Sequence, residues 1–102
     1  CASVPPPTAQ LAVANAAIDN AVSAGAPEFA PVELSSARNK MDLAATAMHR
    51  EDHVLARQLA EEAQADARLA EKIAQSAKAR KAAGVTQDDA RVLREEINRK
   101  SN

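Results

Sequence analysis

Aromatic residues are almost absent from this 102-residue chain, which has one phenylalanine and no tryptophan or tyrosine. Strands rich in aromatic side chains therefore cannot be built from it. Only two glycines and five prolines are available to interrupt helices. More than half of the hydrophobic content is alanine, the strongest helix former. The composition predicts an all-α fold with a thin core, in which the helices approach one another closely.

Charge of one sign is missing from the start of the chain, because residues 1–33 contain no lysine or arginine. From Arg68 onward, nine basic residues accompany five acidic ones. This mildly basic half is compatible with weak contact to an anionic polymer such as peptidoglycan, although interleaved acids are also typical of a solvated face. The basic stretch 78–81 is short and lacks aromatic neighbours, so we expect no nucleic-acid binding.

A second cysteine is also missing, so Cys1 cannot form a disulfide within the chain. A sequence that starts on cysteine and continues with small residues, here Ala2, Ser3 and Val4, is typical of a bacterial lipoprotein after removal of its signal peptide. We expect diacylglycerol and an N-acyl chain, such as palmitate, on Cys1. Buried acyl chains contribute about 0.8 kcal/mol per methylene, enough to hold a protein at a bilayer. The expected location is the periplasmic face of the outer membrane.

One domain is the expectation for this length. Residues 1–7 contain a Pro5-Pro6-Pro7 run, which favours extended polyproline II and predicts a short lipidated tether. Residues 8–100 are expected to form the alanine-rich helical domain, and residues 101–102 a disordered tail. The first helix is predicted from Thr8, as its N-cap, to about Ala24, with Gly25 ending it.

A second helix is predicted from Pro31 to about Arg50, after a turn over residues 25–31. Pro31 suits the first helical position, and Phe29 is spaced to pack on Leu34 as a hydrophobic staple. Its apolar residues recur at steps of three and four, as in coiled coils and antiparallel bundles. They are Leu34, Ala37, Met41, Ala44, Ala45 and Met48.

A corner at Glu51 and Asp52 is predicted to lead into a long helix over about 52–83, with Gly84 as a stop. Its expected stripe comprises Ala56, Leu59, Ala63, Ala70, Ile73 and Ala77. Thr86 and Asp89 then resemble a new start signal. The pattern leaves open whether residues 86–100 form a separate helix or a bent extension. The whole chain is expected to be an antiparallel helical hairpin or a three-to-four-helix bundle.

Three stretches of the chain carry a family resemblance: CASVPPPTAQLAVANAAIDNA, APEFAPVELSSARNKM and LARQLAEEAQADARLAE. Residues 1–83 resemble the uncharacterised bacterial family called domain of unknown function 4398. Its members are similar to one another as short alanine-rich periplasmic lipoproteins, or as the first part of proteins with an OmpA-like peptidoglycan-binding domain. The resemblance implies a helical bundle without a known activity. No OmpA-like sequence follows residue 83, so the resemblance does not imply peptidoglycan binding.

Catalytic chemistry finds little support in the sequence. Adjacent carboxylates such as Glu61 and Glu62 point in different directions on a helix, whereas acid-base catalysis needs convergent groups in a pocket. Met48, His49 and His53 together would suit copper or zinc, which accept imidazole and thioether ligands. The predicted corner separates the two histidines and spoils that geometry. We therefore expect no enzyme, no metal and no cofactor besides the lipid on Cys1, and keep copper or zinc binding as a remote alternative.

The sequence favours a protein that acts by contact, as an accessory or scaffold subunit of an outer-membrane or envelope assembly. Its partner is expected to be another protein or a second copy, because alanine faces let helices dock closely. The candidate contact residues are Phe29, Leu34, Met41, Met48, Leu59 and Ile73. Two alternatives are a pilotin-like chaperone of a secretion channel, which needs an apolar groove, and a murein-lipoprotein-like spacer, which needs one uninterrupted helix.

Overall fold

The computed structural model describes residues 4–101, so the predicted lipid site at Cys1 and the tail residue Asn102 lie outside the described residues. Every regular element in the described part is a helix: α1 (Thr8–Ala24), α2 (Ala26–Phe29), α3 (Pro31–His49) and α4 (His53–Ser101). The prediction of an all-α single domain with one long helix is thus confirmed.

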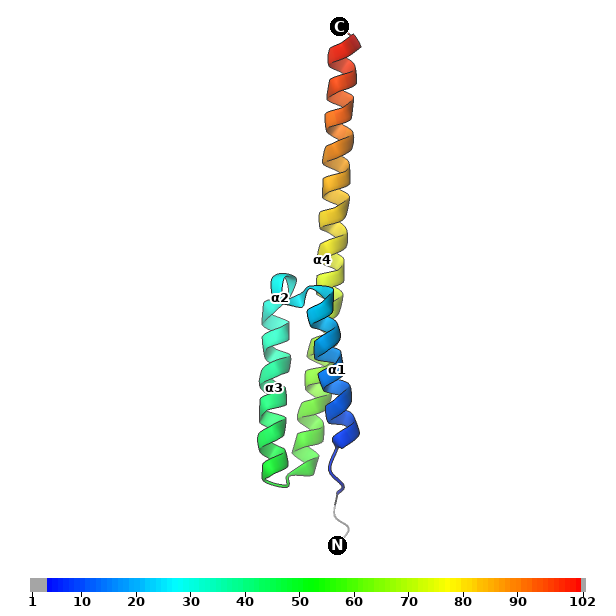
Figure 1. Ribbon diagram of the computed structural model, residues 1–102. Coiled ribbons are helices and arrows are strands. Elements are labelled where there is room, and N and C mark those ends of the chain that lie inside the picture. The colour runs from blue at the N-terminus through cyan, green and yellow to red at the C-terminus, as the bar shows by residue number, and fades with distance from the viewer. Residues whose placement is uncertain (1–3, 102) are drawn as a thin grey trace.

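Three helical segments lie side by side in the lower half of the molecule: α1, α3 and the first half of α4 (Figure 1). We call this part the bundle. The rest of α4 continues alone beyond it, so the C-terminal end of α4 lies at the opposite end of the molecule from residues 4–7. The molecule measures 86 × 17 × 14 Å. We call residues 75–101 the overhang, because Ala74 is the last buried residue among the side chains of α4 that the structure describes.

Helix α1 begins at Thr8 and is preceded by Pro7 at the N-cap position, without a side-chain cap. The expectation that Thr8 itself is the N-cap is wrong by one residue. The Pro7 carbonyl accepts the first helical bond, from the Leu11 N–H at 3.0 Å, so Thr8 already belongs to the first turn. Proline suits this junction because it has no N–H of its own to satisfy.

Gly25 ends α1 as predicted, with φ at +100°, and its N–H donates to the Val22 carbonyl. A residue with a Cβ is strained at this φ. The expected turn over residues 25–31 contains one short helix, α2, before Pro31 starts α3. Phe29 is half-buried and packs against the core cluster that contains Leu34, as the staple spacing predicts.

The corner between α3 and α4 is also confirmed. Glu51 has φ at +59°, and the Asp52 N–H donates to the Ala47 carbonyl at 2.9 Å. The Asp52 side chain then accepts a hydrogen bond from the Leu55 N–H at 3.2 Å and thereby caps α4. A left-handed residue followed by a capping aspartate reverses the chain within three residues.

The predicted stop of the long helix at Gly84 is wrong, because α4 runs without a break from His53 to Ser101. A glycine inside a helix costs only about 1 kcal/mol relative to alanine, which lowers helix stability without ending the helix. Thr86 and Asp89 consequently start no new helix. Residues 86–100 are a continuation of α4, which settles the question that the sequence pattern left open.

The core of the bundle consists almost entirely of alanine. Sixteen hydrophobic side chains are buried, and only Ile18 and Leu34 among them are larger than alanine. On α4 the buried positions alternate at steps of four and three: Ala56, Ala60, Ala63, Ala67, Ala70 and Ala74. The predicted larger members of this stripe, Leu59 and Ile73, are half-buried beside it. A row of small side chains lets the backbones of neighbouring helices approach closely.

Candidate functional site

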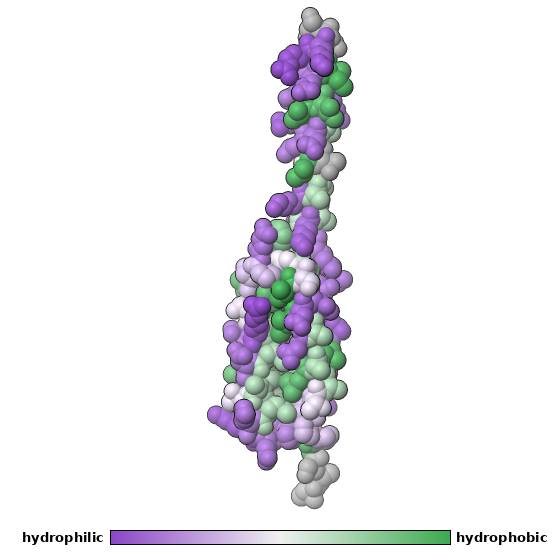
Figure 2. Space-filling model, in the orientation of Figure 1, coloured by the Kyte–Doolittle hydropathy of each residue, from purple (hydrophilic) through white to green (hydrophobic). Residues whose placement is uncertain are grey.

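The overhang is the part of α4 whose side chains are not covered by α1 and α3. Its large apolar residues are all exposed, at 55% for Val85, 47% for Val92, 60% for Leu93 and 62% for Ile97. Figure 2 shows these hydrophobic side chains as separate green groups among polar ones on the projecting helix. An apolar surface of this kind on an extended helix is typical of an interaction surface.

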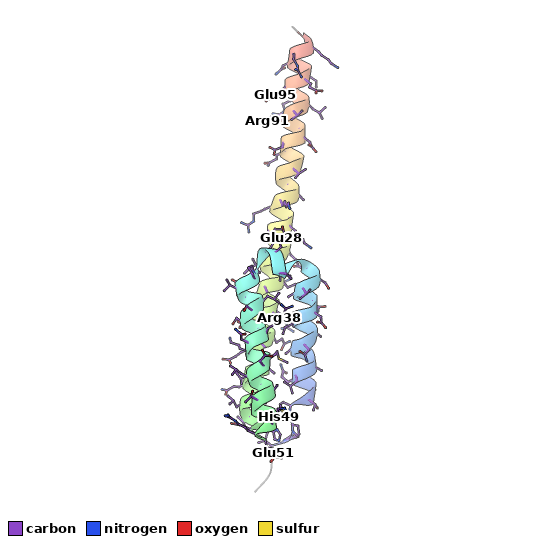
Figure 3. The ribbon with its side chains drawn as sticks, turned by 60° about the vertical axis from the view of Figure 1, so that its left-hand side comes forward. Glu28, Arg38, His49, Glu51, Arg91 and Glu95 are labelled. Atoms are coloured by element: carbon purple, nitrogen blue, oxygen red, sulfur yellow. The ribbon has the colours of Figure 1, made fainter. Side chains whose placement is uncertain are left out.

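Charged residues share the overhang with this apolar surface. Arg91 and Glu95 lie on the projecting helix, far from Glu28 at the near end of the bundle (Figure 3). Opposite charges four residues apart stabilise a helix by a few tenths of a kcal/mol. Opposite charges at this spacing would stabilise the overhang through its own residues. No helix of the bundle packs on the overhang beyond the level of α2 (Figure 1).

The junction between the bundle and the overhang is lined by Phe29 of α2 and by Lys78, Lys81 and Val85 of α4. The Lys81 Nζ lies 5.9 Å from the centroid of the Phe29 ring, a cation–π distance. Sequence reasoning identified Phe29 as a packing residue but missed its lysine partner, which lies more than fifty residues away. This contact fixes the short α2 against the start of the overhang.

A polar cluster joins α3 to α4 at the middle of the bundle. The Lys40 Nζ lies 2.7 Å from the Asp66 Oδ2, and the Ser36 hydroxyl donates to the same oxygen at 2.8 Å. Partial burial works to raise the pKa of Asp66, but the hydrogen bonds from Lys40 and Ser36, with the Lys40 charge, outweigh it and hold that pKa below its usual value. The hydrogen bond to Asp66 raises the pKa of Lys40. This cluster fixes the register of the two helices.

A second polar contact links α1 to α4. The Gln10 side-chain N–H donates to the Gln64 Oε1 at 2.9 Å. Both polar contacts between helices lie at the edges of the alanine core, where both partners are only partly buried. These two contacts favour one alignment of the helices. Alanine packing alone would specify that alignment only weakly.

The predicted contact residues divide into two groups. Leu34 is 2% exposed and lies within the core of the bundle. The other five are half-buried: Phe29, Met41, Met48, Leu59 and Ile73. Leu59 lines a shallow hollow beside the corner with Leu43 and Leu55, between α3 and α4. Of these five, Phe29, Met41 and Ile73 pack partly on the buried clusters of the bundle. Exposed apolar side chains are found on the bundle, such as Val32 and Leu43, as well as on the overhang.

The histidines lie at the corner, where His49 ends α3 and His53 starts α4. The helix is broken between them, as predicted, and Figure 3 shows His49 beside Glu51 at this end of the bundle. Among residues 4–101, no three histidine, cysteine, aspartate or glutamate side chains gather in a metal-binding group. The described part of the chain also holds no helix long and apolar enough to span a membrane.

The fold defines this chain as a small all-α protein with an alanine-cored bundle and a projecting helix. Residues 9–86 match the family described as domain of unknown function (DUF4398), so the chain belongs to that family. The match covers the bundle and the first turns of the overhang. No curated protein and no solved structure matches the chain.

Proposed function

We propose that this protein is a non-enzymatic, lipid-anchored contact subunit of the bacterial envelope, which presents the overhang to a partner. The observation that carries the proposal is the continuation of α4 beyond the bundle with four large apolar side chains exposed. Apolar side chains along a helix that its own chain leaves uncovered can dock against a partner helix. The partner is a helix of an outer-membrane or periplasmic assembly, or of a second copy.

The proposed anchor is a lipid on Cys1, at the periplasmic face of the outer membrane. Residues 4–6 line a hollow with the corner residues 51–54, at the end of the bundle opposite the overhang. An anchor a few residues before Val4 would therefore hold the corner end near the bilayer and direct the overhang away from it. This arrangement gives the overhang access to partners that stand off the membrane surface.

The length of α4 also favours a second candidate, a spacer that sets a distance within the envelope. A helix rises about 1.5 Å per residue, so the 49 residues of α4 span roughly 70 Å without a break. The sequence raised three helix breakers, Pro27, Pro31 and Gly84, and the lack of a terminal lysine against this candidate. Of these, only the break at Gly84 is absent from the structure. A spacer and a contact subunit differ in whether the sequence of the overhang matters or only its length.

Metabolic labelling with a palmitate analogue tests the anchor. We expect label on the wild-type protein and its loss in Cys1→Ser, with Ser3→Ala as a control that keeps the label. A photo-crosslinking amino acid at position 93 in cells tests the contact, with position 43 on α3 as the matched exposed control. Adducts are expected from position 93 only. Equal adducts from both positions, or none, would contradict the contact function.

A length-preserving substitution separates the two candidates. If Val85, Val92 and Leu93 are replaced together by glutamine, the helix keeps its length and loses most of its exposed apolar surface. A contact subunit then loses its adducts at a neighbouring reporter position such as Ala90. If the protein is a spacer, the triple glutamine variant keeps the function of the wild type. Deletion of seven residues from the overhang then abolishes that function instead.

A further inference from the structure

A second line of apolar residues follows α4 on the face turned away from α1 and α3. Its members are spaced as in a heptad repeat, and we call them the outer stripe: Leu69, Ala79, Ala83, Ala90, Leu93 and Ile97. All six are exposed. Leu69 is 52% exposed although Ala67 and Ala70 on either side of it are fully buried against the other helices. The outer stripe is therefore a separate face from the alanine row of the bundle.

The sequence marks the outer stripe by its period. Positions 69, 76, 83, 90 and 97 recur every seven residues, and positions 72, 79 and 93 lie at the alternate points of the same repeat. A seven-residue repeat is typical of helices that wind around one another. Lys72 and Ser76 interrupt the apolar series close to the bundle, and position 86 of the same repeat is Thr86. The part best suited to pairing therefore lies toward the end of α4, where Ala90, Leu93 and Ile97 follow one another without a polar residue at a repeat position.

As a single helix without a partner, the overhang has low stability. Short helices without tertiary contacts are marginal in water, and Gly84 lowers helix stability further by about 1 kcal/mol. A Cβ placed on Gly84 would meet no atom of another element within 4 Å, so the bundle does not pack against this position. A neighbouring helix on the outer stripe would cover Leu93 and supply the missing contacts.

We propose that the outer stripe pairs with the outer stripe of a second copy, in parallel and in register. The proposal rests on the proposed contact function and names its partner. The charged residues that flank the stripe support this orientation. Asp89 precedes the stripe residue Ala90, and Arg94 follows the stripe residue Leu93. These are the flanking positions whose charges select partner and orientation in paired helices. In a parallel pair, each Asp89 lies beside Arg94 of the other copy, twice by symmetry.

The opposite orientation is disfavoured by the same residues. An antiparallel pair about the outer stripe brings each Asp89 beside Glu96 of the other copy, so like charges meet twice. The parallel pair also places both bundles, and both segments of residues 4–7, at one end. That arrangement suits two chains that are fastened to one membrane. Helices α1 and α3 lie on the other side of α4 and do not obstruct it.

The oligomeric state of the full chain tests the pairing. Residues 1–102 with Cys1→Ser, which removes the only native thiol, are expected to show twice the 10.7 kDa of one chain in light scattering after size exclusion. Leu93→Glu is expected to return the mass of a monomer. Val92→Glu is the matched control, because Val92 is exposed beside Leu93 but lies off the outer stripe, and it should keep the dimer. Unchanged thermal unfolding of the bundle in both variants confirms that only pairing is affected.

Disulfide trapping tests the orientation. Ala83→Cys in the Cys1→Ser protein brings the two thiols together in a parallel pair, where Cα atoms approach within the roughly 4–7 Å that a disulfide needs. In an antiparallel pair the two positions are more than about 10 Å apart along the helix axis. Rapid oxidation to a cross-linked dimer is expected. Asp89→Arg and Arg94→Asp should each weaken dimerisation several-fold, and the double variant should restore it.

Two outcomes separate this inference from the proposed function. A monomeric Cys1→Ser protein that also fails to cross-link through Ala83→Cys overturns the pairing, while adducts of another protein from position 93 in cells leave the contact function intact. A purified dimer without any adduct from position 93 in cells supports the pairing and overturns the proposed contact function. Cross-linking of an antiparallel kind, or Val92→Glu acting like Leu93→Glu, also overturns the pairing as stated.

Discussion

The two halves of α4 use the same residue types in opposite ways. In the bundle, alanines such as Ala63 and Ala70 are fully buried, because α1 and α3 lie against them. In the overhang, alanines such as Ala83 and Ala90 are exposed, on a part of α4 that α1 and α3 do not cover. Alanine therefore acts as core material or as surface according to what stands beside it. The difference shows that partner helices, more than composition, define this core.

The largest expected difference between the halves comes from enlarging an alanine. Ala63→Leu should destabilise the bundle by about 1–3 kcal/mol, because the added side chain forces closely packed helices apart. That change lowers the midpoint of thermal unfolding by several degrees, measured by circular dichroism. The matched variant Ala83→Leu adds the same atoms to the overhang and should leave bundle unfolding unchanged. Equal losses in both variants would show that the overhang is packed like the bundle.

Exchanging the two glycines for alanine sharpens the comparison with effects of opposite sign. Gly25→Ala is expected to destabilise the protein by about 1 kcal/mol or more, because φ is +100° and the new Cβ would lie 2.7 Å from the Lys78 Cε. Gly84→Ala meets no atom within 4 Å and should stabilise the overhang by about 0.5–1 kcal/mol. Hydrogen exchange of residues 80–90 measures the second effect. Faster exchange in Gly84→Ala would contradict it.

The smallest expected effect concerns the Lys40–Asp66 pair, which only the bundle possesses. The lowered pKa of Asp66 means that its contribution to stability is present above the ordinary value of 3.8 and is lost as the pH falls below it. Asp66→Asn should cost up to about 1 kcal/mol at neutral pH, and the difference from wild type should shrink as the pH falls below 3.8.

Glu61→Gln is the control for that measurement. Glu61 lies 3.7 Å from Arg57 in an exposed pair on the same helix, with both side chains more than half exposed. Its loss should leave urea unfolding within error of wild type at every pH. An equal loss of stability in Glu61→Gln would mean that any charged pair stabilises the bundle to this extent, and that the Lys40–Asp66 pair between α3 and α4 has no special role.

Local signals in the sequence were sufficient for most of the fold. Gly25, Pro31 and the Glu51-Asp52 corner predicted three helix boundaries correctly, because each acts through its own backbone. Gly84 failed as a signal for the same reason that Gly25 succeeded. At Gly25 the chain adopts a φ that favours glycine, whereas Gly84 keeps helical geometry and costs the helix only about 1 kcal/mol relative to alanine, so the helix continues.

Contacts between distant residues were harder to predict. The interaction of Lys81 with Phe29 and that of Lys40 with Asp66 depend on how the helices align, which no local pattern states. Of the predicted stripe of α4, Ala56, Ala63 and Ala70 are buried, whereas Leu59, Ile73 and Ala77 are half-buried. The positions that the prediction missed are also alanines: Ala60, Ala67 and Ala74. Larger side chains at those points would keep the helices apart. The sequence did not predict the overhang, because the expected stop at Gly84 hid the continuity of α4.

The continuity of α4 has a mechanical consequence. A flexible linker as long as the 27-residue overhang would have a root-mean-square reach of roughly 30 Å in every direction. As a helix, the same residues extend about 40 Å along a single line set by the bundle. A partner bound near Leu93 would thus be held at a fixed distance and direction from the corner. Rotation of the bundle would rotate that partner by the same angle.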